Sequence, residues 1–260
     1  MSQAWPLKRV GLRVRNLEST LAYYQRLGLA IVRDQRAEGI IGLGAGEVEL
    51  LTLRHTPAAP VRKPHTAGLY HFAFLLPSET DLASFLQHCL TGAGARIDGA
   101  SDHLVSQALY LNDPEENGIE VYADRPRSEW FYKPDGQVSM ATDRLKADEL
   151  LARAKDFHGF PEGTILGHMH LNVSNLAESL AFYEQTFGLN LMAKIYDQAG
   201  FVSWDGYHHH LGLNTWTGPN ATRHERTVSG IEFFEFSRSD LPTGTYEDPN
   251  GVTVVVSPSE

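Results

Sequence analysis

The sequence is poor in cysteine, in basic charge and in long apolar runs, and each shortage excludes a class of protein. The one cysteine, Cys89, cannot form an intramolecular disulfide, which is typical of a reducing compartment. The formal net charge is -10, so the electrostatic field opposes nucleic acids and anionic membrane surfaces. No apolar stretch is long enough to cross a bilayer, and the first residues lack the apolar segment of a signal peptide. We expect a cytoplasmic protein that binds neither nucleic acid nor membrane.

Histidine, by contrast, is abundant. The 260 residues include 12 histidines and 4 methionines, and several of the histidines lie inside apolar, strand-like runs. Hydrophobic residues make up 42% and charged residues 21%, which is ordinary for a globular protein with a sizeable core. The placement of the histidines, more than their number, therefore points to a functional site.

The sequence contains an internal duplication. One motif recurs with a single inserted residue, and a second motif introduces an apolar strand in both halves, which indicates a repeated structural unit. The first motif is Val14-Arg-Asn-Leu17, Leu21-Ala-Tyr-Tyr24 and Gly28-Leu29, repeated as Val173-Ser-Asn-Leu176, Leu180-Ala-Phe-Tyr183 and Gly188-Leu189. The second is Asp113-Pro-Glu-Glu-Asn-Gly118, repeated as Asp248-Pro-Asn-Gly251.

Each copy predicts the same order of elements. Alternating apolar residues from Val10 to Val14 predict a strand, and Asn16 or Asn175 is placed to cap the helix that follows. The first half predicts further strands at 30–34, 39–43, 48–53 and 70–76, a helix at 78–90, and strands at 104–111 and 119–123. We therefore expect four βαβββ modules, near residues 8–54, 68–124, 166–216 and 229–257.

The segment between the halves does not follow this plan. Residues 127–132 are rich in aromatic side chains, and residues 148–157 predict a helix. The fourth module leaves too few residues between Phe236 and Tyr246 for a helix. We expect an N-terminal domain at 1–125, a connecting segment at 126–163, and a C-terminal domain at 164–260 with one full and one shortened module.

These motifs resemble the vicinal oxygen chelate superfamily, which includes glyoxalases, bleomycin-resistance proteins and extradiol dioxygenases. The Val-x-Asn-Leu, Phe-Tyr and Gly-Leu signature and the Asp-Pro-x-Gly turn carry the resemblance, which spans essentially the whole chain. The two-copy arrangement is similar to the two-domain catechol 2,3-dioxygenase-like members. The resemblance implies an α+β fold in which four βαβββ modules form two domains with cupped mixed sheets.

Two residues in the second module are candidate metal ligands. His71 stands near the start of an apolar strand, and Glu120 lies in the middle of another, where an unpaired buried carboxylate would be costly. A core histidine and an edge strand with Glu120 facing water are the alternatives.

The third module offers two histidines for the same site. His168 and His170 lie on one face of a strand, so alternation does not choose between them. The resemblance favours His168, five residues before Val173, as the ligand, and leaves His170 as a substrate-binding residue. Two histidines and one carboxylate hold Fe(II), or alternatively Mn(II), with open positions for substrate and oxygen.

Further positions match catalytic residues of the extradiol dioxygenases. Tyr110 precedes the glutamate by ten residues and leads into an Asp-Pro turn, and His103 lies near a family histidine, offset by two residues. The family's acid–base histidine falls in the run His208–His210, for which a polar loop or an adventitious metal tract is the alternative. The resemblance implies a catalytic role for His209 or His210. In glyoxalase-like members, His210 would instead be a fourth ligand.

The fourth module departs from the family pattern. The usual two-domain extradiol enzymes take their ligands from the third and fourth modules, whereas here Phe233 and Thr253 stand at the fourth module's ligand positions, and Arg9 stands at the first module's. The second and third modules would therefore supply one site per chain, either within one chain or by exchange in a homodimer.

The resemblance implies an extradiol, non-haem metal-dependent dioxygenase that cleaves the ring of a catechol-type aromatic with O2. Trp216 is a candidate for substrate binding, with packing in the core as the alternative. A glyoxalase-like metal-dependent isomerase or lyase is one alternative function. A non-catalytic protein that binds an aromatic compound or an antibiotic is another, and metal content distinguishes it from the enzymes.

Overall fold

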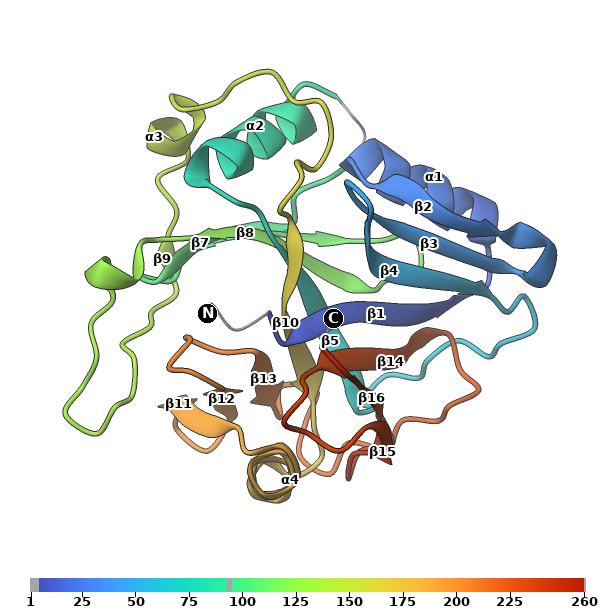
Figure 1. Ribbon diagram of the computed structural model, residues 1–260, viewed down its shortest axis with the longest axis vertical. Helices are drawn as coiled ribbons and strands as arrows, with labels where there is room; N and C mark the ends of the chain where they lie inside the picture. Colours follow the sequence, from blue (N-terminus) through green and yellow to red (C-terminus); the bar gives the residue numbers. More distant parts are fainter. Residues whose placement is uncertain (1–4, 93–94, 260) are drawn as a thin grey trace.

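The computed structural model describes residues 5–92 and 95–259, and its first half contains the first two modules (Figure 1). The first module consists of β1 (Leu7–Val14), α1 (Leu17–Leu27), β2 (Ala30–Gln35), the short helix η1 (Arg36–Glu38), β3 (Ile40–Ala45) and β4 (Val48–His55). The second consists of β5 (Gly68–Leu75), α2 (Glu79–Leu90), β6 (Gly99–Asp102), β7 (Ser106–Asn112) and β8 (Gly118–Asp124).

The second half repeats the order after a connecting segment. That segment contains η2 (Arg127–Glu129), β9 (Asp143–Arg144) and α3 (Ala147–Leu151). The third module consists of β10 (Ile165–Asn172), α4 (Leu176–Phe187), β11 (Asn190–Ile195), β12 (Ala199–Ser203) and β13 (Leu211–Asn214). The fourth consists of β14 (Gly230–Ser237), β15 (Gly244–Glu247) and β16 (Thr253–Ser257), and no helix interrupts this described stretch.

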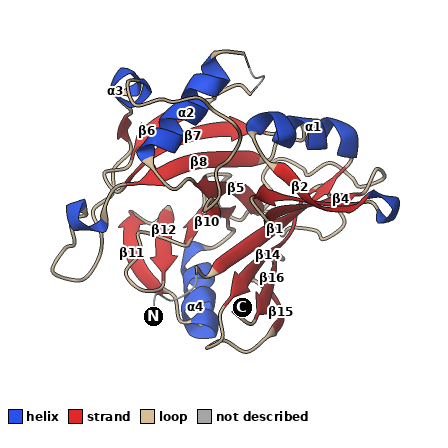
Figure 2. Ribbon diagram, turned by 45° about the horizontal axis from the view of Figure 1, so that its top comes forward, coloured by secondary structure: helices blue, strands red, loops and turns tan. Residues whose placement is uncertain are grey.

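Two curled mixed sheets confirm the predicted α+β fold. One sheet has seven strands in the order β15-β16-β14-β1-β4-β3-β2, and the other has nine in the order β11-β12-β13-β10-β5-β8-β7-β6-β9. Each sheet joins a module from one half of the chain to a module from the other. The expected domains at 1–125 and 164–260 therefore each contribute to both sheets, and the inner modules lie side by side within one chain. Helices α1, α2 and α4 lie outside the strands (Figure 2).

Local signals in the sequence mark the ends of α1 and α4, the two helices that the duplication repeats. The Asn16 side chain accepts a hydrogen bond from the Ser19 N–H at 3.1 Å, and Asn175 accepts one from the Glu178 N–H at 3.2 Å. Such caps satisfy N–H groups that have no partner inside the helix. Both helices end at a glycine in the left-handed region, as the sequence predicts.

A buried tyrosine in each of these helices holds the module that follows. The Tyr24 hydroxyl donates to the Asp113 carboxylate at 2.9 Å, and the Tyr183 hydroxyl donates to Asp248 at 3.0 Å. The two aspartates belong to the repeated Asp-Pro turns, and their side chains also accept backbone N–H groups of those turns. Helix α1 is thereby fixed to the turn before β8, and α4 to the turn before β16.

Two predicted elements are shorter than expected. The helix predicted at 148–157 ends at Leu151, because the chain turns away so that the Lys155 N–H donates to the Ser84 hydroxyl at 2.9 Å. The strand predicted from Leu104 begins at Ser106. Leu104 has a φ of 69° in a turn where Asp102 accepts its N–H.

Among the described residues, no helix combines the length and apolar character that a membrane crossing requires. Part of the segment considered for a signal peptide, residues 1–4, lies outside the described residues.

The tyrosine–aspartate bonds can be tested against a neighbouring tyrosine. Tyr24→Phe should lower the free energy of unfolding by about 1–3 kcal/mol, because it removes a donor from a buried carboxylate. Tyr23 is the matched control, since its buried hydroxyl has no hydrogen-bond partner among the residues that the structure describes. Tyr23→Phe should leave stability unchanged or raise it slightly. Urea unfolding of both variants measures the difference, and equal losses would contradict the assignment.

Candidate metal centre

Three adjacent strands bring the predicted ligands together. His168 lies on β10, His71 on β5 and Glu120 on β8, and these strands are neighbours in the nine-stranded sheet. The His71 Nε2 atom is 3.1 Å from Glu120 Oε2 and 3.3 Å from His168 Nε2, and His168 Nε2 is 3.3 Å from Glu120 Oε2. Among residues 5–92 and 95–259, no other group of three or more His, Cys, Asp or Glu side chains has this arrangement.

The geometry of the three donor atoms fits one cation. Atoms separated by 3.1–3.3 Å can all lie about 2.0–2.2 Å from a common ion, the usual bond length for imidazole nitrogen and carboxylate oxygen. All three side chains are buried. A buried carboxylate between two imidazoles needs a compensating positive charge, so the residues present fit a divalent metal.

Burial and mutual contact set the protonation of the donors. Burial alone would raise the pKa of Glu120, but the adjacent His168 and His71 hold that pKa well below its ordinary value. Burial lowers the pKa of His168 to about 4, against the opposing effect of Glu120. At pH 7, Glu120 is therefore ionised and His168 is neutral, which are the states that bind metal.

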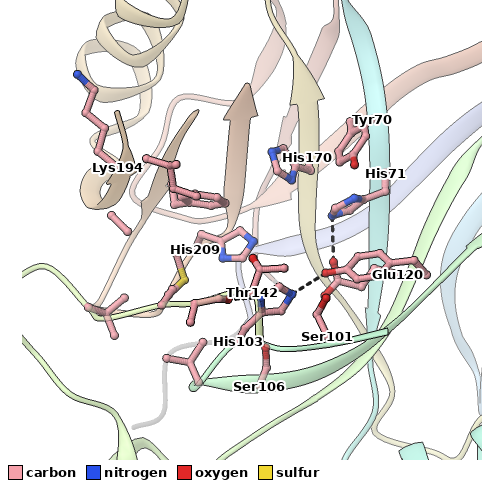
Figure 3. A pocket seen from close by; sticks show the side chains of 18 of the residues that line it. Tyr70, His71, Ser101, His103, Ser106, Glu120, Thr142, His170, Lys194 and His209 are labelled. Carbon is pink, nitrogen blue, oxygen red and sulfur yellow. Dashed lines mark hydrogen bonds and ion pairs between the residues drawn. The ribbon is translucent and has the colours of Figure 1, made fainter. Parts of the chain in front are cut away.

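Two of the three donors, those of His71 and Glu120, face a cavity of about 360 Å³ (Figure 3). His71 and Glu120 line it together with Tyr110, His103, His209, His170 and Trp216. The rest of its wall is mainly apolar and comes partly from the connecting segment and β11. These apolar wall residues are Val105, Val138, Met140, Ala141, Ala193, Ile195 and Phe201. Its volume and composition are those of a small-molecule site.

Tyr110 and His103 form a hydrogen-bonded pair in this cavity. The His103 Nδ1–H donates to the Ala141 carbonyl at 2.6 Å, since a carbonyl can only accept. In the neutral ring the Nε2 atom is then the acceptor, and the Tyr110 hydroxyl donates to it at 2.6 Å. Burial, followed by the nearby Glu120, raises the pKa of Tyr110 well above its ordinary value. Tyr110 therefore keeps its proton at neutral pH.

The three consecutive histidines lie in the loop before β13, and they point in different directions. The His209 ring lines the cavity and packs against His168, with ring centroids 4.2 Å apart and the ring planes tilted by 47°. His210 is turned away from the cavity, where its Nδ1 atom accepts the Trp204 N–H at 3.2 Å and its ring packs on Tyr207. This placement does not support the predicted catalytic role of His210, nor a role as fourth ligand.

His170 and Trp216 lie at the side of the cavity. The His170 ring packs against Tyr70 and Trp216, with centroids 5.1 and 5.3 Å away, and its buried Nε2 atom has no hydrogen-bond partner within residues 5–92 and 95–259. Gly212 makes room for this ring, because a Cβ atom there would lie 2.9 Å from it. Burial lowers the pKa of His170 well below its ordinary value, so the ring is uncharged.

Sequence reasoning missed Asp124 and the connecting segment. Asp124 accepts a hydrogen bond from His208 Nε2 at 3.0 Å. Strand alternation could have found it, because Glu120, Tyr122 and Asp124 lie on one face of β8. No motif signals that Val138 and Met140 cover the cavity, where the Val138 N–H donates to the Met192 carbonyl of β11 at 2.8 Å.

The seven-stranded sheet fills the corresponding position with an ion pair. Arg9 stands at the His168 position, and its guanidinium bonds Glu235 at 2.7 Å and Glu49 at 3.4 Å. Phe233 replaces His71 and lies over Gly11, where a Cβ would be 2.3 Å from its ring. Strand β16 carries no carboxylate. The predicted loss of the second site therefore has a direct structural cause.

Comparison with known families agrees with this fold. The model of the Glyoxalase/Bleomycin resistance protein/Dioxygenase superfamily matches residues 7–121 and 165–243. The chain is 40% identical over 230 residues to a protein named catechol-2,3-dioxygenase from Bacillus subtilis (strain 168), covering 86% of this chain and 79% of that protein. The chain therefore belongs to this superfamily, and its similarity is to a dioxygenase member.

Solved structures show the same fold at low sequence identity. A putative dioxygenase from Bacillus subtilis subsp. subtilis str. 168 aligns with a TM-score of 0.63 and 13% identity, covering 96% of this chain and 84% of that one. Glyoxalase I from Zea mays aligns with a TM-score of 0.58 and 15% identity, covering 96% and 91%. The two neighbours carry different activities on one fold, so function has to be argued from the site.

Buried neutral histidines make the metal-free protein sensitive to acid. Burial lowers the pKa of His168 and His224 to about 4, and that of His170, His209 and His210 well below 6.5. Between pH 6.5 and 4 the unfolded chain binds these protons and the folded chain does not, so the free energy of unfolding should fall as the pH falls. Each proton contributes about 1.4 kcal/mol per pH unit.

Urea unfolding of the metal-free protein at several pH values measures this slope. We expect uptake of more than two protons on unfolding near pH 5. Uptake of fewer than two would show that these rings are already protonated in the folded protein.

Proposed function

We propose that this protein is an extradiol, ring-cleaving dioxygenase that acts on a catechol-type aromatic with O2 and uses Fe(II), or alternatively Mn(II). The observation that carries the proposal is a single two-histidine, one-glutamate group that opens onto an apolar cavity. Such a group leaves adjacent positions open on the metal. The 40% identity to a protein named catechol-2,3-dioxygenase supports the same activity.

His71, His168 and Glu120 would hold the metal. When bound, the metal would act as a Lewis acid for the diol and pass electrons from the diol to dioxygen, so that the substrate is the reductant and the metal ends in its starting oxidation state. The chain's own contribution is to orient the ring and to exclude water. The apolar wall formed by Met140, Val138 and Phe201 provides that exclusion.

Proton transfer is assigned to His209 and Tyr110. His209 lines the cavity beside the metal ligands and takes a proton from a substrate hydroxyl as general base. Tyr110 lies on β7, paired with Glu120 of β8. Without substrate its hydroxyl donates to His103. When substrate binds, the hydroxyl would turn its one O–H to a substrate oxygen and stabilise the charge that develops there. His170 and Trp216 are assigned to the binding of the ring.

The glyoxalase-like alternative is less well supported. That reading expects a fourth protein ligand, for which His210 was the candidate. His210 instead accepts the Trp204 N–H and packs between aromatic rings outside the cavity.

The proposal predicts one iron or manganese per chain and oxygen consumption with a catechol. Protein purified without oxygen should take up O2 when a catechol is added and should form a yellow ring-cleavage product. Glu120→Gln should lose both the bound metal and oxygen uptake. Thr253→Gln, at the corresponding position of the fourth module, should retain both. Stoichiometric zinc or nickel with no uptake, or a protein without metal, would overturn the proposal.

The cavity predicts a catechol that carries an apolar substituent. An apolar cavity of about 150 Å³ holds benzene, and this one has about 360 Å³. Each buried CH2 group contributes about 0.8 kcal/mol, so an alkyl or phenyl substituent should raise kcat/KM at least about tenfold over catechol. Steady-state oxygen uptake with both substrates measures the ratio.

Ala193→Leu supplies the control for this preference, because Ala193 lies in the apolar wall away from the metal ligands. The variant should lose the advantage of the substituted substrate and retain activity on catechol itself. Equal effects on both substrates would contradict the assignment of this wall.

A further inference from the structure

A chain of hydrogen bonds runs from the cavity to the end of β8. The Nδ1 atom of His209 lies 2.7 Å from the Nδ1 atom of His208, and the Nε2 atom of His208 lies 3.0 Å from a carboxylate oxygen of Asp124. His209 lines the cavity, and its ring is seen there in Figure 3. The other two residues lie behind it, on the side away from the substrate space.

The direction of each hydrogen bond follows from the carboxylate. An ionised carboxylate only accepts, so His208 carries its proton on Nε2 and donates it to Asp124. In the neutral His208 ring, Nδ1 then holds a lone pair and accepts the Nδ1–H of His209. The neutral His209 ring is left with an unprotonated Nε2. A proton on the other nitrogen of either ring would put two donors or two lone pairs opposite each other.

Packing against aromatic rings fixes His208, the middle residue of this chain of hydrogen bonds. The His208 side chain is buried between the rings of Tyr207 and Trp130, with centroids 4.0 and 5.2 Å away. The hydroxyls of Tyr207 and Tyr122 are 2.8 Å apart, which fixes Tyr207 to the strand that carries Asp124. The Asp124 side chain is 23% exposed, so the chain of hydrogen bonds ends at a carboxylate that is accessible to water.

We propose that Asp124 is a positioning residue which, through His208, fixes the ring orientation and tautomer of His209 so that an unprotonated Nε2 faces the cavity. The inference rests on the proposed function in assigning the substrate proton to His209. For two neutral rings, the tautomer itself follows from these hydrogen bonds. The same logic explains why a carboxylate-to-amide change behind a catalytic histidine costs about 10⁴-fold in rate in serine proteases, where it stabilises the wrong tautomer.

Asp124→Asn tests the proposal with a change of one atom. The amide N–H would donate to His208 Nε2, which reverses the direction of both hydrogen bonds and places a proton on His209 Nε2. Nitrogen NMR of histidine-labelled protein, loaded with diamagnetic Zn(II), reads the tautomer of His209 directly. We expect the Nδ1–H tautomer in the parent protein and the Nε2–H tautomer in Asp124→Asn. With a catechol and the native metal, kcat should fall by about 10²-fold or more, with KM and metal content unchanged.

Two further variants separate positioning from general damage. Asp124→Glu keeps the carboxylate and should retain the parent tautomer and most of kcat. Asp205→Asn makes the same acid-to-amide change in the loop that leads to His208, outside the hydrogen-bond chain, and should match the parent protein.

The outcomes are distinct. An Nε2–H tautomer in the parent protein, or an Asp124→Asn variant with unchanged tautomer and unchanged kcat, would overturn the proposal. A loss of kcat in Asp205→Asn equal to that in Asp124→Asn would also overturn it. If the tautomers behave as expected and no diol is cleaved, the positioning role stands and the proposed reaction fails.

Discussion

The pairing of β5 with β10 determines where everything else in the site lies. The two strands come from different halves of the duplicated chain, and their antiparallel register places His71 opposite His170 and two residue pairs from His168. Strand β8 pairs with β5 on the other side and adds Glu120. A shift of one residue in either pairing would turn the ligands to the opposite face of the sheet. The register is therefore as important to the site as the identity of the ligands.

The two sheets differ in how the negative charge of their buried carboxylates is compensated. In the nine-stranded sheet, Glu120 faces the imidazoles of His71 and His168, and a bound cation would compensate its charge. In the seven-stranded sheet, the cation is the Arg9 guanidinium, which bonds Glu49 and Glu235. A permanent internal charge stabilises that sheet without metal and leaves no open position for a substrate. The duplication has thus produced one sheet suited to chemistry and one suited to support.

Much of the fold and part of the site could be predicted from the sequence. The repeat, the Asn caps and the Gly helix ends are local signals, and they gave the order of elements correctly. Spacing and the family resemblance also selected His71, Glu120 and His168, which the strands bring together. The sequence did not predict where each side chain in the run at 208–210 points. These orientations depend on a contact with Asp124, which is distant in the sequence, and on a contact with Trp204, which lies in a loop. The contribution of the connecting segment to the cavity likewise depends on tertiary packing.

The ends of the chain meet in the seven-stranded sheet, where Leu7 of β1 pairs with Phe236 of β14. During synthesis on the ribosome, the first strand therefore has no partner on that edge until almost the whole chain has emerged. Pairing over such a sequence distance makes folding slow, because the loop entropy must be overcome before the contacts form. An exposed strand edge of this kind has unpaired N–H and C=O groups and can therefore pair with another chain. The β14-facing edge of β1 therefore stays open to such pairing until residues 230–237 have been synthesised.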